Sequence, residues 1–205
     1  MSINWLEWAR QIQSIAQAGL SFSENQYDID RYNQLRDLSV EIMSEYTDVS
    51  KDKVRELFAN ETGYQTPKVD IRSAVFKNGK ILMVREKIDG RWSLPGGWAD
   101  VNATVKESAV KECFEEAGAN VEPLRIIAIT YANRPNELKF AFSVYKVFVE
   151  CRLVDFQFAA NTETLEAGFF GMDELPDLSV NRNTFEQIKM CFDSKNKVCL
   201  EPFFD

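Results

Sequence analysis

Three glutamates near the middle of the chain have a spacing suited to metal chemistry. Glu112, Glu115 and Glu116 are three and four positions apart, so on a helix their carboxylates are neighbours along one rim. Hard divalent cations such as Mg²⁺ take oxygen ligands of this kind. A charge run is more commonly a solvated acidic helix face. The Gly96-Gly97 pair ahead of the glutamates favours a metal site, because glycines let the backbone double back against the carboxylates.

The chain contains no histidine. This excludes Ser-His and Cys-His catalytic pairs and imidazole metal ligands, so acid–base and metal chemistry must fall to carboxylates. The four cysteines are scattered and form no CxxC pair: Cys113, Cys151, Cys191 and Cys199. We expect them to be free thiols in a reducing compartment.

The three glutamates belong to a predicted helix whose two ends are marked in the sequence. Thr104 and Glu107 have the spacing of a capping box, so the helix should begin at Val105, and Gly118 supplies a left-handed stop. At ~100° per residue its apolar side chains share one half of the helix. That half comprises Val105, Ala109, Val110, Cys113, Phe114 and Ala117. We predict that it packs on a β-sheet, with the glutamates at its edge.

The elements around this helix change in character near residue 65. Before about Asn60 the apolar period is helical, and we expect helices from Trp5 to a stop at Gly19, over 24–46, and from 51 onwards. Residues 61–67 have the composition of a linker.

Beyond the linker the sequence favours strands. The β-like runs cover 69–76, 81–85, 125–131 and 140–148. Asn78-Gly79 is a hairpin signal between the first two runs, and a last helix is expected over 183–193. The sequence therefore predicts an α/β (α+β) protein with a helical domain at 1–62 and a sheet domain at 67–205.

Charge and hydropathy argue against two classes of partner. With 24 Lys+Arg against 32 Asp+Glu the net charge is −8, which disfavours electrostatic binding of nucleic acid. The start has no signal-peptide pattern, and no apolar run approaches the roughly 18 residues of a membrane span. We expect a soluble, cytoplasmic protein without a membrane partner.

Residues 97–119 resemble the Nudix box, a pattern of Gly, five residues, Glu, seven residues, then Arg-Glu-aliphatic-any-Glu-Glu-any-Gly-aliphatic. The positions that match in register are Gly97, Glu112, Glu115, Glu116 and Gly118. The flanking Trp92-Ser93-Leu94-Pro95-Gly96-Gly97 and the later segment 169–176 also look like this family. The resemblance covers about residues 67–205.

Some positions depart from the Nudix pattern. Ala103 stands where the first Glu is expected, and Lys111 replaces Arg, which keeps the charge but loses the planar fork that braces a carboxylate. Cys113 and Ala119 are weak substitutes for the aliphatic residues.

The resemblance implies a Nudix fold, a mixed sheet between helices, and metal-assisted hydrolysis of the pyrophosphate bond in a nucleoside diphosphate linked to another moiety. It implies Mg²⁺ or Mn²⁺ as the cofactor. The residues it assigns to the metal are Glu112, Glu115 and Glu116, and those it assigns to the substrate are Gly96, Gly97 and Arg85.

The helical region resembles the module that precedes the Nudix domain in bacterial hydrolases of CDP-choline or ADP-ribose. The resemblance makes CDP-choline the expected substrate, ADP-ribose the second, and a homodimer the expected assembly. Nothing in the residues themselves identifies cytosine. Two other functions stay open. One is a ligand-binding Nudix sensor without catalysis, which Ala103 keeps open although the intact Glu112, Glu115 and Glu116 argue against it, and the other is a secondary hydrolysis of RNA ends.

The missing carboxylate at Ala103 requires a proton acceptor from elsewhere for the attacking water. The best-placed candidates are Glu163 and Glu166, which precede a predicted strand that the resemblance puts beside the metal. We favour Glu163, because a loop residue can move when substrate and metal arrive. A solvated acidic loop, with the base within the Glu112–Glu116 cluster, is the alternative.

Overall fold

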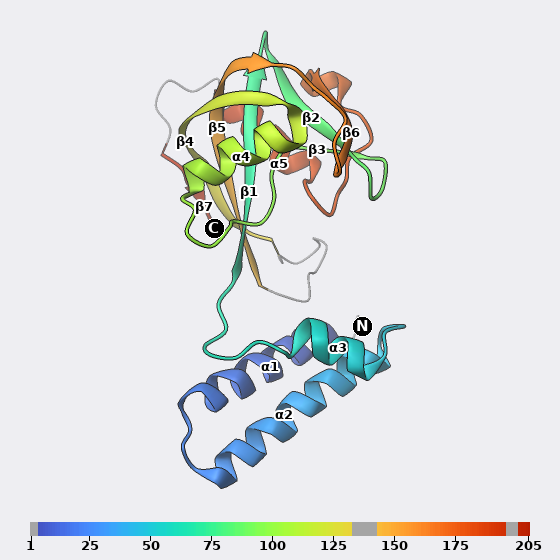
Figure 1. Ribbon diagram of the computed structural model, residues 1–205, viewed down its shortest axis with the longest axis vertical. Helices are drawn as coiled ribbons and strands as arrows, with labels where there is room; N and C mark the ends of the chain where they lie inside the picture. Colours follow the sequence, from blue (N-terminus) through green and yellow to red (C-terminus); the bar gives the residue numbers. More distant parts are fainter. Residues whose placement is uncertain (1–3, 133–142, 196–200) are drawn as a thin grey trace. The chain divides into compact units, whose positions relative to one another are not determined.

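The structure, a computed structural model, describes residues 4–132, 143–195 and 201–205. These residues form two units: one contains the chain up to Pro67, and the other contains most of the chain from Lys68 onwards. The first unit is all-helical, and the second is built around a β-sheet (Figure 1).

Three helices make up the first unit. They are α1 (Trp5–Phe22), α2 (Gln26–Glu45) and α3 (Lys51–Phe58). The side chain of Asn25 caps α2 by accepting a hydrogen bond from the Tyr27 N–H, and Ser50 caps α3 in the same way from the Lys53 N–H. The buried core of this unit is small and consists of Ala9, Val40, Met43, Val54, Phe58 and Ala59.

The prediction that the first helix stops at Gly19 is wrong, because α1 continues to Phe22. Gly19 serves the packing of α1 on α2 instead: a Cβ at this position would lie 2.3 Å from the ring of Tyr32. The glycine therefore marks a close approach of two helices, a signal that resembles a helix stop in the sequence alone.

The second unit contains a mixed sheet. Its described strands are β1 (Lys68–Lys77), β2 (Lys80–Glu86), β3 (Trp92–Ser93), β4 (Ala119–Tyr131), β5 (Val144–Phe156), β6 (Thr164–Phe170) and β7 (Phe203–Phe204). Their order across the sheet is β3-β2-β1-β5-β4-β7, and β6 pairs with β2. β1 is parallel to β5 and antiparallel to β2, while β4 is antiparallel to β5.

Helices cover both faces of this sheet. α4 (Val105–Ala117) packs on one face, and α5 (Phe185–Lys195) packs on the other; a short 3-10 helix, η1 (Met172–Glu174), follows β6 (Figure 1). Successive residues of β2 alternate between the faces, so Leu82 contributes to the core under α4 and Met83 to the core under α5. The predicted α/β architecture, a mixed sheet between helices preceded by a helical region, is confirmed.

Several element boundaries differ from the predicted ones. The Asn78-Gly79 hairpin is confirmed, with positive φ at both residues (51° and 76°). β4 begins at Ala119 rather than 125, because Gly118 (φ 62°) turns the chain directly from α4 into the strand. α5 covers Phe185–Lys195 rather than 183–193. Part of the strand expected at 140–148 lies outside the described residues, where β5 begins at Val144.

The described cysteines are free and buried, as predicted for Cys113, Cys151 and Cys191; Cys199 lies outside the described residues. Among the helices that the structure describes, none combines the length and the apolar character that a membrane span requires.

Candidate active site

Glu116 of α4 is held inside the protein by the Gly96-Gly97 loop. It is only 3% exposed, and its Oε2 accepts a hydrogen bond of 2.8 Å from the Gly96 N–H. A Cβ on Gly96 (φ 147°) would lie 1.9 Å from the Ile71 carbonyl oxygen, so only glycine can occupy this position without a steric clash. Burial raises the pKa of Glu116 to about 8, although Arg72 and the Gly96 N–H act in the opposite direction. A nearby cation would favour its charged form.

Glu112 lies one turn earlier on α4, beside the same loop, and is partly buried. A Cβ on Gly97 would lie 3.0 Å from its Oε1, so the loop backbone packs against this carboxylate. Burial raises the pKa of Glu112; nearby positive charges oppose the rise, and the charges of Glu115 and Glu163 add to it. The two glycines therefore bring one loop against two carboxylates that are both destabilised in their charged forms.

Glu115 is not brought together with these two residues. Its Oε2 lies 3.8 Å from the Nζ of Lys111, and both side chains are about half exposed. Lys111 also forms an ion pair of 2.5 Å with Asp100, which raises the pKa of the lysine. The residue that replaces the Nudix-box arginine therefore neutralises acidic side chains on the outer side of α4.

The described carboxylates provide part of a cation site. In the part of the chain that the structure describes, no group of three or more Asp, Glu or Cys side chains converges closely enough to hold a metal ion. Mg²⁺ usually binds through one or two carboxylates, with waters and substrate phosphates completing its coordination. Glu112 and Glu116 fit such a cation as hard oxygen donors beside one loop.

A buried ion pair behind the loop was not anticipated from the sequence. Arg72 of β1 is 2% exposed and donates to both carboxylate oxygens of Asp70, at 3.0 and 3.1 Å from its Nε. Its Nη1 also donates to the Leu94 carbonyl oxygen at 3.2 Å, two residues before Gly96. Arg72 thus connects the central strand to the loop that holds Glu116, and its charge opposes the pKa rise of that residue. Asp70 and Arg72 are two positions apart on an apolar strand, a signal that could have revealed the pair.

Glu86 at the end of β2 is a second buried carboxylate next to the loop. It is 3% exposed, accepts a hydrogen bond of 2.7 Å from the Ser93 hydroxyl and lies 3.5 Å from Arg182. Next to Arg182, the side chain of Asn183 accepts a hydrogen bond of 2.9 Å from the Leu94 N–H. The segment before α5 therefore fixes the loop from the side opposite to α4.

The loop that carries Glu163 is tied to the C-terminal end of α4. Thr164 Oγ1 donates to the Glu116 carbonyl oxygen at 2.6 Å, and the Asn161 amide donates to the same oxygen at 3.2 Å. Asn161 Oδ1 accepts from the backbone N–H groups of Glu163 and Thr164. These bonds bring Glu163 near enough to Glu112 for its charge to raise the pKa of that residue. Sequence reasoning selected Glu163 but missed Asn161 and Thr164.

Glu166 has different surroundings. It lies within β6, directly opposite Arg85 of β2, and the two side chains form an ion pair of 3.0 Å. Arg85 also donates from its Nε to the Gly90 carbonyl oxygen at 2.9 Å. Both side chains are partly exposed, so the pair lies at the surface, and Glu166 is already neutralised by Arg85.

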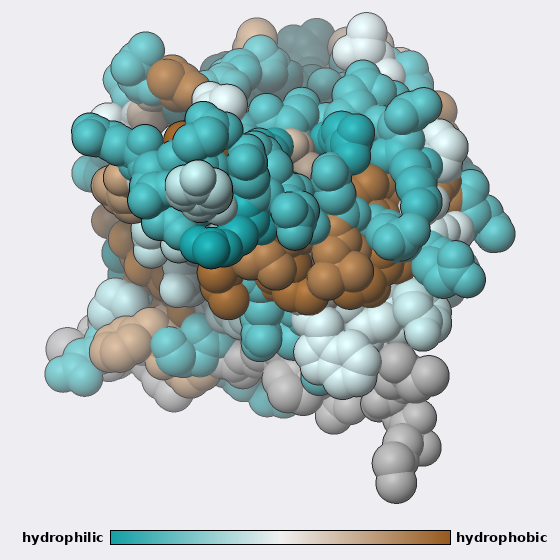
Figure 2. All heavy atoms as spheres, turned by 90° about the horizontal axis from the view of Figure 1, so that it is seen from below, coloured by the Kyte–Doolittle hydropathy of each residue, from teal (hydrophilic) through white to brown (hydrophobic). Residues whose placement is uncertain are grey.

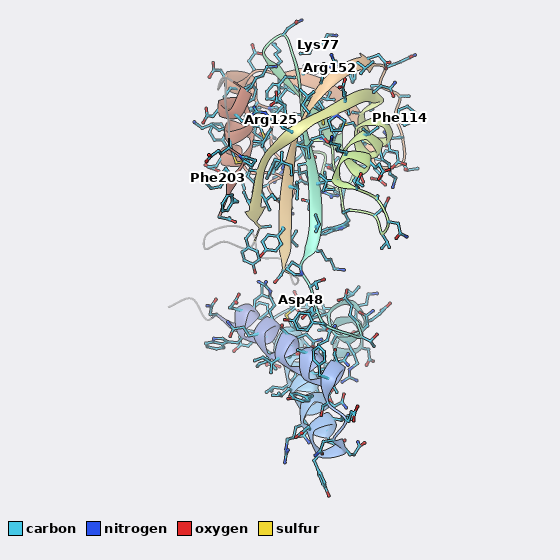
Figure 3. The ribbon with its side chains drawn as sticks, turned by 90° about the vertical axis from the view of Figure 1, so that its left-hand side faces the viewer. Asp48, Lys77, Phe114, Arg125, Arg152 and Phe203 are labelled. Carbon is cyan, nitrogen blue, oxygen red and sulfur yellow. The ribbon has the colours of Figure 1, made fainter. Side chains whose placement is uncertain are left out.

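The predicted capping box at the start of α4 is confirmed, with hydrogen bonds in both directions between Thr104 and Glu107. The predicted buried face is wrong in part: Val110 is 37% and Phe114 is 59% exposed, and Figure 3 shows Phe114 on the outer side of α4. The helix is rotated because it buries Glu116, which the Gly96 N–H satisfies. A hydrophobic pattern cannot anticipate a carboxylate on the inner face.

Two family models match consecutive segments of the chain. One is described as "UDP-X-like, N-terminal oligomerisation domain" and matches residues 4–58. The other is described as "NUDIX domain" and matches residues 66–189, which include the loop, α4 and the Glu163 segment.

Relatives support the same assignment over most of the chain. A Bacillus subtilis protein provisionally named an ADP-ribose pyrophosphatase is 43% identical over 189 residues, covering 92% of this chain and 91% of its own. A solved structure named an ADP-ribose pyrophosphatase, from Streptococcus suis, is 46% identical, covers 68% of this chain and 100% of its own, and has a TM-score of 0.62. A solved UDP-X diphosphatase is 30% identical over 98% of both chains, with a TM-score of 0.65.

Proposed function

Because the chain belongs to the Nudix hydrolase family, we propose that it hydrolyses the pyrophosphate bond of a nucleoside diphosphate linked to a second moiety. The observation that carries the proposal is the placement of Glu112 and Glu116 against the Gly96-Gly97 loop. With buried carboxylates and no histidine in the chain, metal-assisted attack of water on phosphorus is the chemistry these residues support.

ADP-ribose is the first substrate to test. The two relatives that are 43% and 46% identical to this chain are named ADP-ribose pyrophosphatases, and the 30% identical relative is named a UDP-X diphosphatase. CDP-choline, which the sequence resemblance favoured, stays a prediction, because none of these three names mentions it. We therefore rank ADP-ribose first, UDP-linked compounds second and CDP-choline third.

A divalent cation, Mg²⁺ or Mn²⁺, belongs to the proposed site. When bound, it would supply positive charge to the phosphate oxygens and lower the pKa of the attacking water. Glu112 and Glu116 would hold it, with Glu115 assisting once its carboxylate leaves Lys111. Gly96 and Gly97 would admit the substrate close to the backbone, and Arg85 would bind a phosphate in place of Glu166.

Glu163 is our proposed acceptor for the proton of the attacking water. Ala103 provides no carboxylate at the head of α4, whereas Glu163 lies on a loop fixed to α4 and its charge acts on Glu112. Glu166 is the second candidate, and it is held in an ion pair with Arg85. A base needs to reach the water only when substrate and metal are present.

A substrate panel tests the proposal directly. The full chain is incubated with Mg²⁺ and ADP-ribose, a UDP-sugar, CDP-choline, a dinucleotide and a short RNA, in ¹⁸O-labelled water, and the masses of the products are measured. We expect each nucleoside diphosphate compound that is a substrate to give two monophosphate products, only one of which carries ¹⁸O. The labelled product identifies the phosphorus that the water attacks. The matched control is Glu116→Gln, which should give no product above background.

The same panel separates the two alternative functions. If every compound is returned intact while one of them binds, the chain is a sensor and the hydrolase proposal fails. Ala103 is the observation that favours this alternative. If the RNA end is cut faster than every small nucleotide, hydrolysis of RNA is the primary activity, against the expectation from the net charge of −8.

We also propose that residues 1–62 and 67–205 are separate domains and that the chain forms a homodimer through the first. The match of residues 4–58 to an N-terminal oligomerisation domain supports this. Sedimentation equilibrium of the full chain should return a dimer mass at micromolar concentration. A monomer mass at all concentrations would contradict the proposal without affecting the hydrolase assignment.

A further inference from the structure

Helix α1 of the helical unit has more apolar surface than its own unit covers. Ala9, Ala16 and Gln13 are fully buried on the side of α1 that packs within the unit. Three other large apolar side chains of α1 stay largely in solvent: Trp8 is 53%, Ile15 60% and Phe22 76% exposed. Figure 2 shows hydrophobic atoms gathered in a band between hydrophilic ones on the face that it presents. Exposed apolar stripes of this kind commonly mark an interaction site.

These three side chains are spaced for packing against another helix. Trp8, Ile15 and Phe22 follow one another at intervals of seven residues, so they form one stripe along α1. The partly exposed Ile12 falls between Trp8 and Ile15 at spacings of four and three, as in a heptad seam. Gly19 lies between Ile15 and Phe22 at the same spacings, and the ring of Tyr32 from α2 packs against it.

We propose that α1 packs antiparallel against α1 of a second copy of this chain, with the two-fold axis at Ile15. This rests on the homodimer proposed above and assigns the surface and geometry of its contact. The stripe is symmetric about Ile15, because Trp8 lies seven residues before it and Phe22 seven after. An antiparallel pair then places each Trp8 opposite Phe22 of the other copy, which is the self-complementary arrangement a two-fold interface requires.

The distribution of charge selects α1 over α2 as the contact. The 18 residues of α1 contain only Glu7 and Arg10 as charged side chains, and these two lie 3.5 Å apart. The 20 residues of α2 contain five acidic and two basic residues, so two copies of this helix would repel each other. The antiparallel direction also separates the two Glu7 side chains by about 24 Å, at 1.5 Å per residue, whereas a parallel pair would set them side by side.

The exposed area of the three side chains supplies most, but not all, of the area that a stable dimer needs. At about 150–250 Å² for a large side chain, the exposed parts of Trp8, Ile15 and Phe22 amount to roughly 350–400 Å² on each copy. The pair therefore provides about two thirds of the roughly 1,200 Å² at the lower limit of stable interfaces. Flanking residues extend the surface, among them Tyr64, whose ring lies 6.2 Å from that of Phe22.

Cysteine cross-linking of the full chain tests the geometry. In a Cys199→Ser background, Ile15→Cys should form a disulfide-linked dimer under mild oxidation. Helices 8–10 Å apart bring facing Cα atoms on a two-fold axis to roughly 3.4–5.4 Å, which overlaps the disulfide range. Neither Trp8→Cys alone nor Phe22→Cys alone should form a disulfide-linked dimer. A mixture of the two variants should form one, because the antiparallel pair places residue 8 of one copy opposite residue 22 of the other. Ser14→Cys, next to Ile15 but on another face of α1, is the matched control.

The outcomes test the proposed α1–α1 contact separately from the existence of the homodimer. If sedimentation shows a dimer but Ile15→Cys does not cross-link, the seam is wrong and the homodimer stands. If Trp8→Cys and Phe22→Cys each cross-link alone, the helices are parallel and the proposal is overturned. As an independent measurement, Ile15→Glu should raise the dimer dissociation constant at least about 30-fold with an unchanged circular dichroism spectrum. An unchanged dissociation constant would also overturn the seam.

Discussion

An arginine–aspartate pair occurs in both units, and its surroundings differ completely. In the sheet unit, Arg72 and Asp70 are almost fully buried and tie the central strand to the Gly96-Gly97 loop. In the helical unit, Arg55 and Asp37 form a contact of 2.6 Å with more than half of each side chain in solvent. A buried pair is costly to break, because removing one partner leaves an uncompensated charge, whereas an exposed pair contributes little.

The two units also differ in where their apolar side chains lie. The sheet unit has two buried cores, one under each covering helix, while the helical unit has one core cluster of six residues and leaves Trp8, Ile15 and Phe22 exposed. The sheet unit therefore uses its core to hold charges in place for chemistry. The helical unit leaves apolar surface in solvent, which is the surface that we propose for the contact with a second copy.

Removing the buried charge on α4 should have the largest effect. We expect Glu116→Gln to lower turnover by about 10³-fold with Mg²⁺, because the amide keeps the shape and loses the charge that would hold the cation. Its melting temperature should be unchanged or higher, since a buried carboxyl is replaced by a neutral group. Steady-state kinetics and thermal unfolding check both parts. Glu122→Gln, an exposed β4 residue paired with Arg152, is the control; full activity in Glu116→Gln refutes the assignment.

Substitutions of Glu163 and Glu166 should have different effects on the kinetics. Glu163→Gln should lower turnover by about 10²-fold, at the lower end of the effect of removing a general base. Glu166→Gln should act mainly on KM, because it frees Arg85 from its ion pair. Turnover is measured at saturating Mg²⁺ across pH. Wild-type rates and pH profiles for both variants would place the base elsewhere, for instance within the Glu112–Glu116 cluster.

The two arginine–aspartate pairs can be compared by stability. Arg72→Met should lower the free energy of unfolding by about 3–5 kcal/mol, because it leaves Asp70 buried without its main partner. Arg55→Met should lower it by less than about 1 kcal/mol. Differential scanning calorimetry measures both in the full chain. Equal effects would remove the contrast between the two units.

Local signals in the sequence predicted most of the secondary structure. The Asn78-Gly79 turn and the Thr104–Glu107 capping box depend on neighbouring residues, so the sequence alone reveals them. Gly19 and the buried side of α4 were misread, because the cause lies in another element: the Tyr32 ring in one case and the Gly96 N–H in the other.

The candidate site was predictable only as far as its motif extends. Glu112 and Glu116 were found by their spacing beside Gly96-Gly97. Arg72, Glu86 and Thr164 come from three separate strands, and their hydrogen bonds to the loop and to α4 depend on how these strands pair. Long-range pairing of this kind leaves only weak traces in a single sequence, such as two charges on one face of an apolar strand.

Helix caps should give the smallest difference between the units. Thr104 caps α4 and Ser50 caps α3, each by accepting a hydrogen bond from the backbone N–H three residues later. Both contacts are exposed, so Thr104→Ala and Ser50→Ala should each lower the free energy of unfolding by about 1 kcal/mol at neutral pH. Urea denaturation of the full chain measures the two effects. A much larger loss for Thr104→Ala would mean that the cap also positions the site.

The stability effects of Thr104→Ala and Ser50→Ala should depend differently on pH. Glu107 accepts hydrogen bonds from the backbone N–H and the hydroxyl of Thr104, and these lower the pKa of its carboxyl from the ordinary value. A lowered pKa means that the carboxylate stabilises the folded state above its unfolded pKa, and that this stabilisation is lost as the pH falls through the folded pKa. The effect of Thr104→Ala should therefore shrink between pH 5 and pH 3, roughly the range around the reference pKa of Glu. Lys53 occupies the equivalent position on α3, so the effect of Ser50→Ala should stay constant. Parallel pH profiles for the two variants would show that Glu107 does not support its cap.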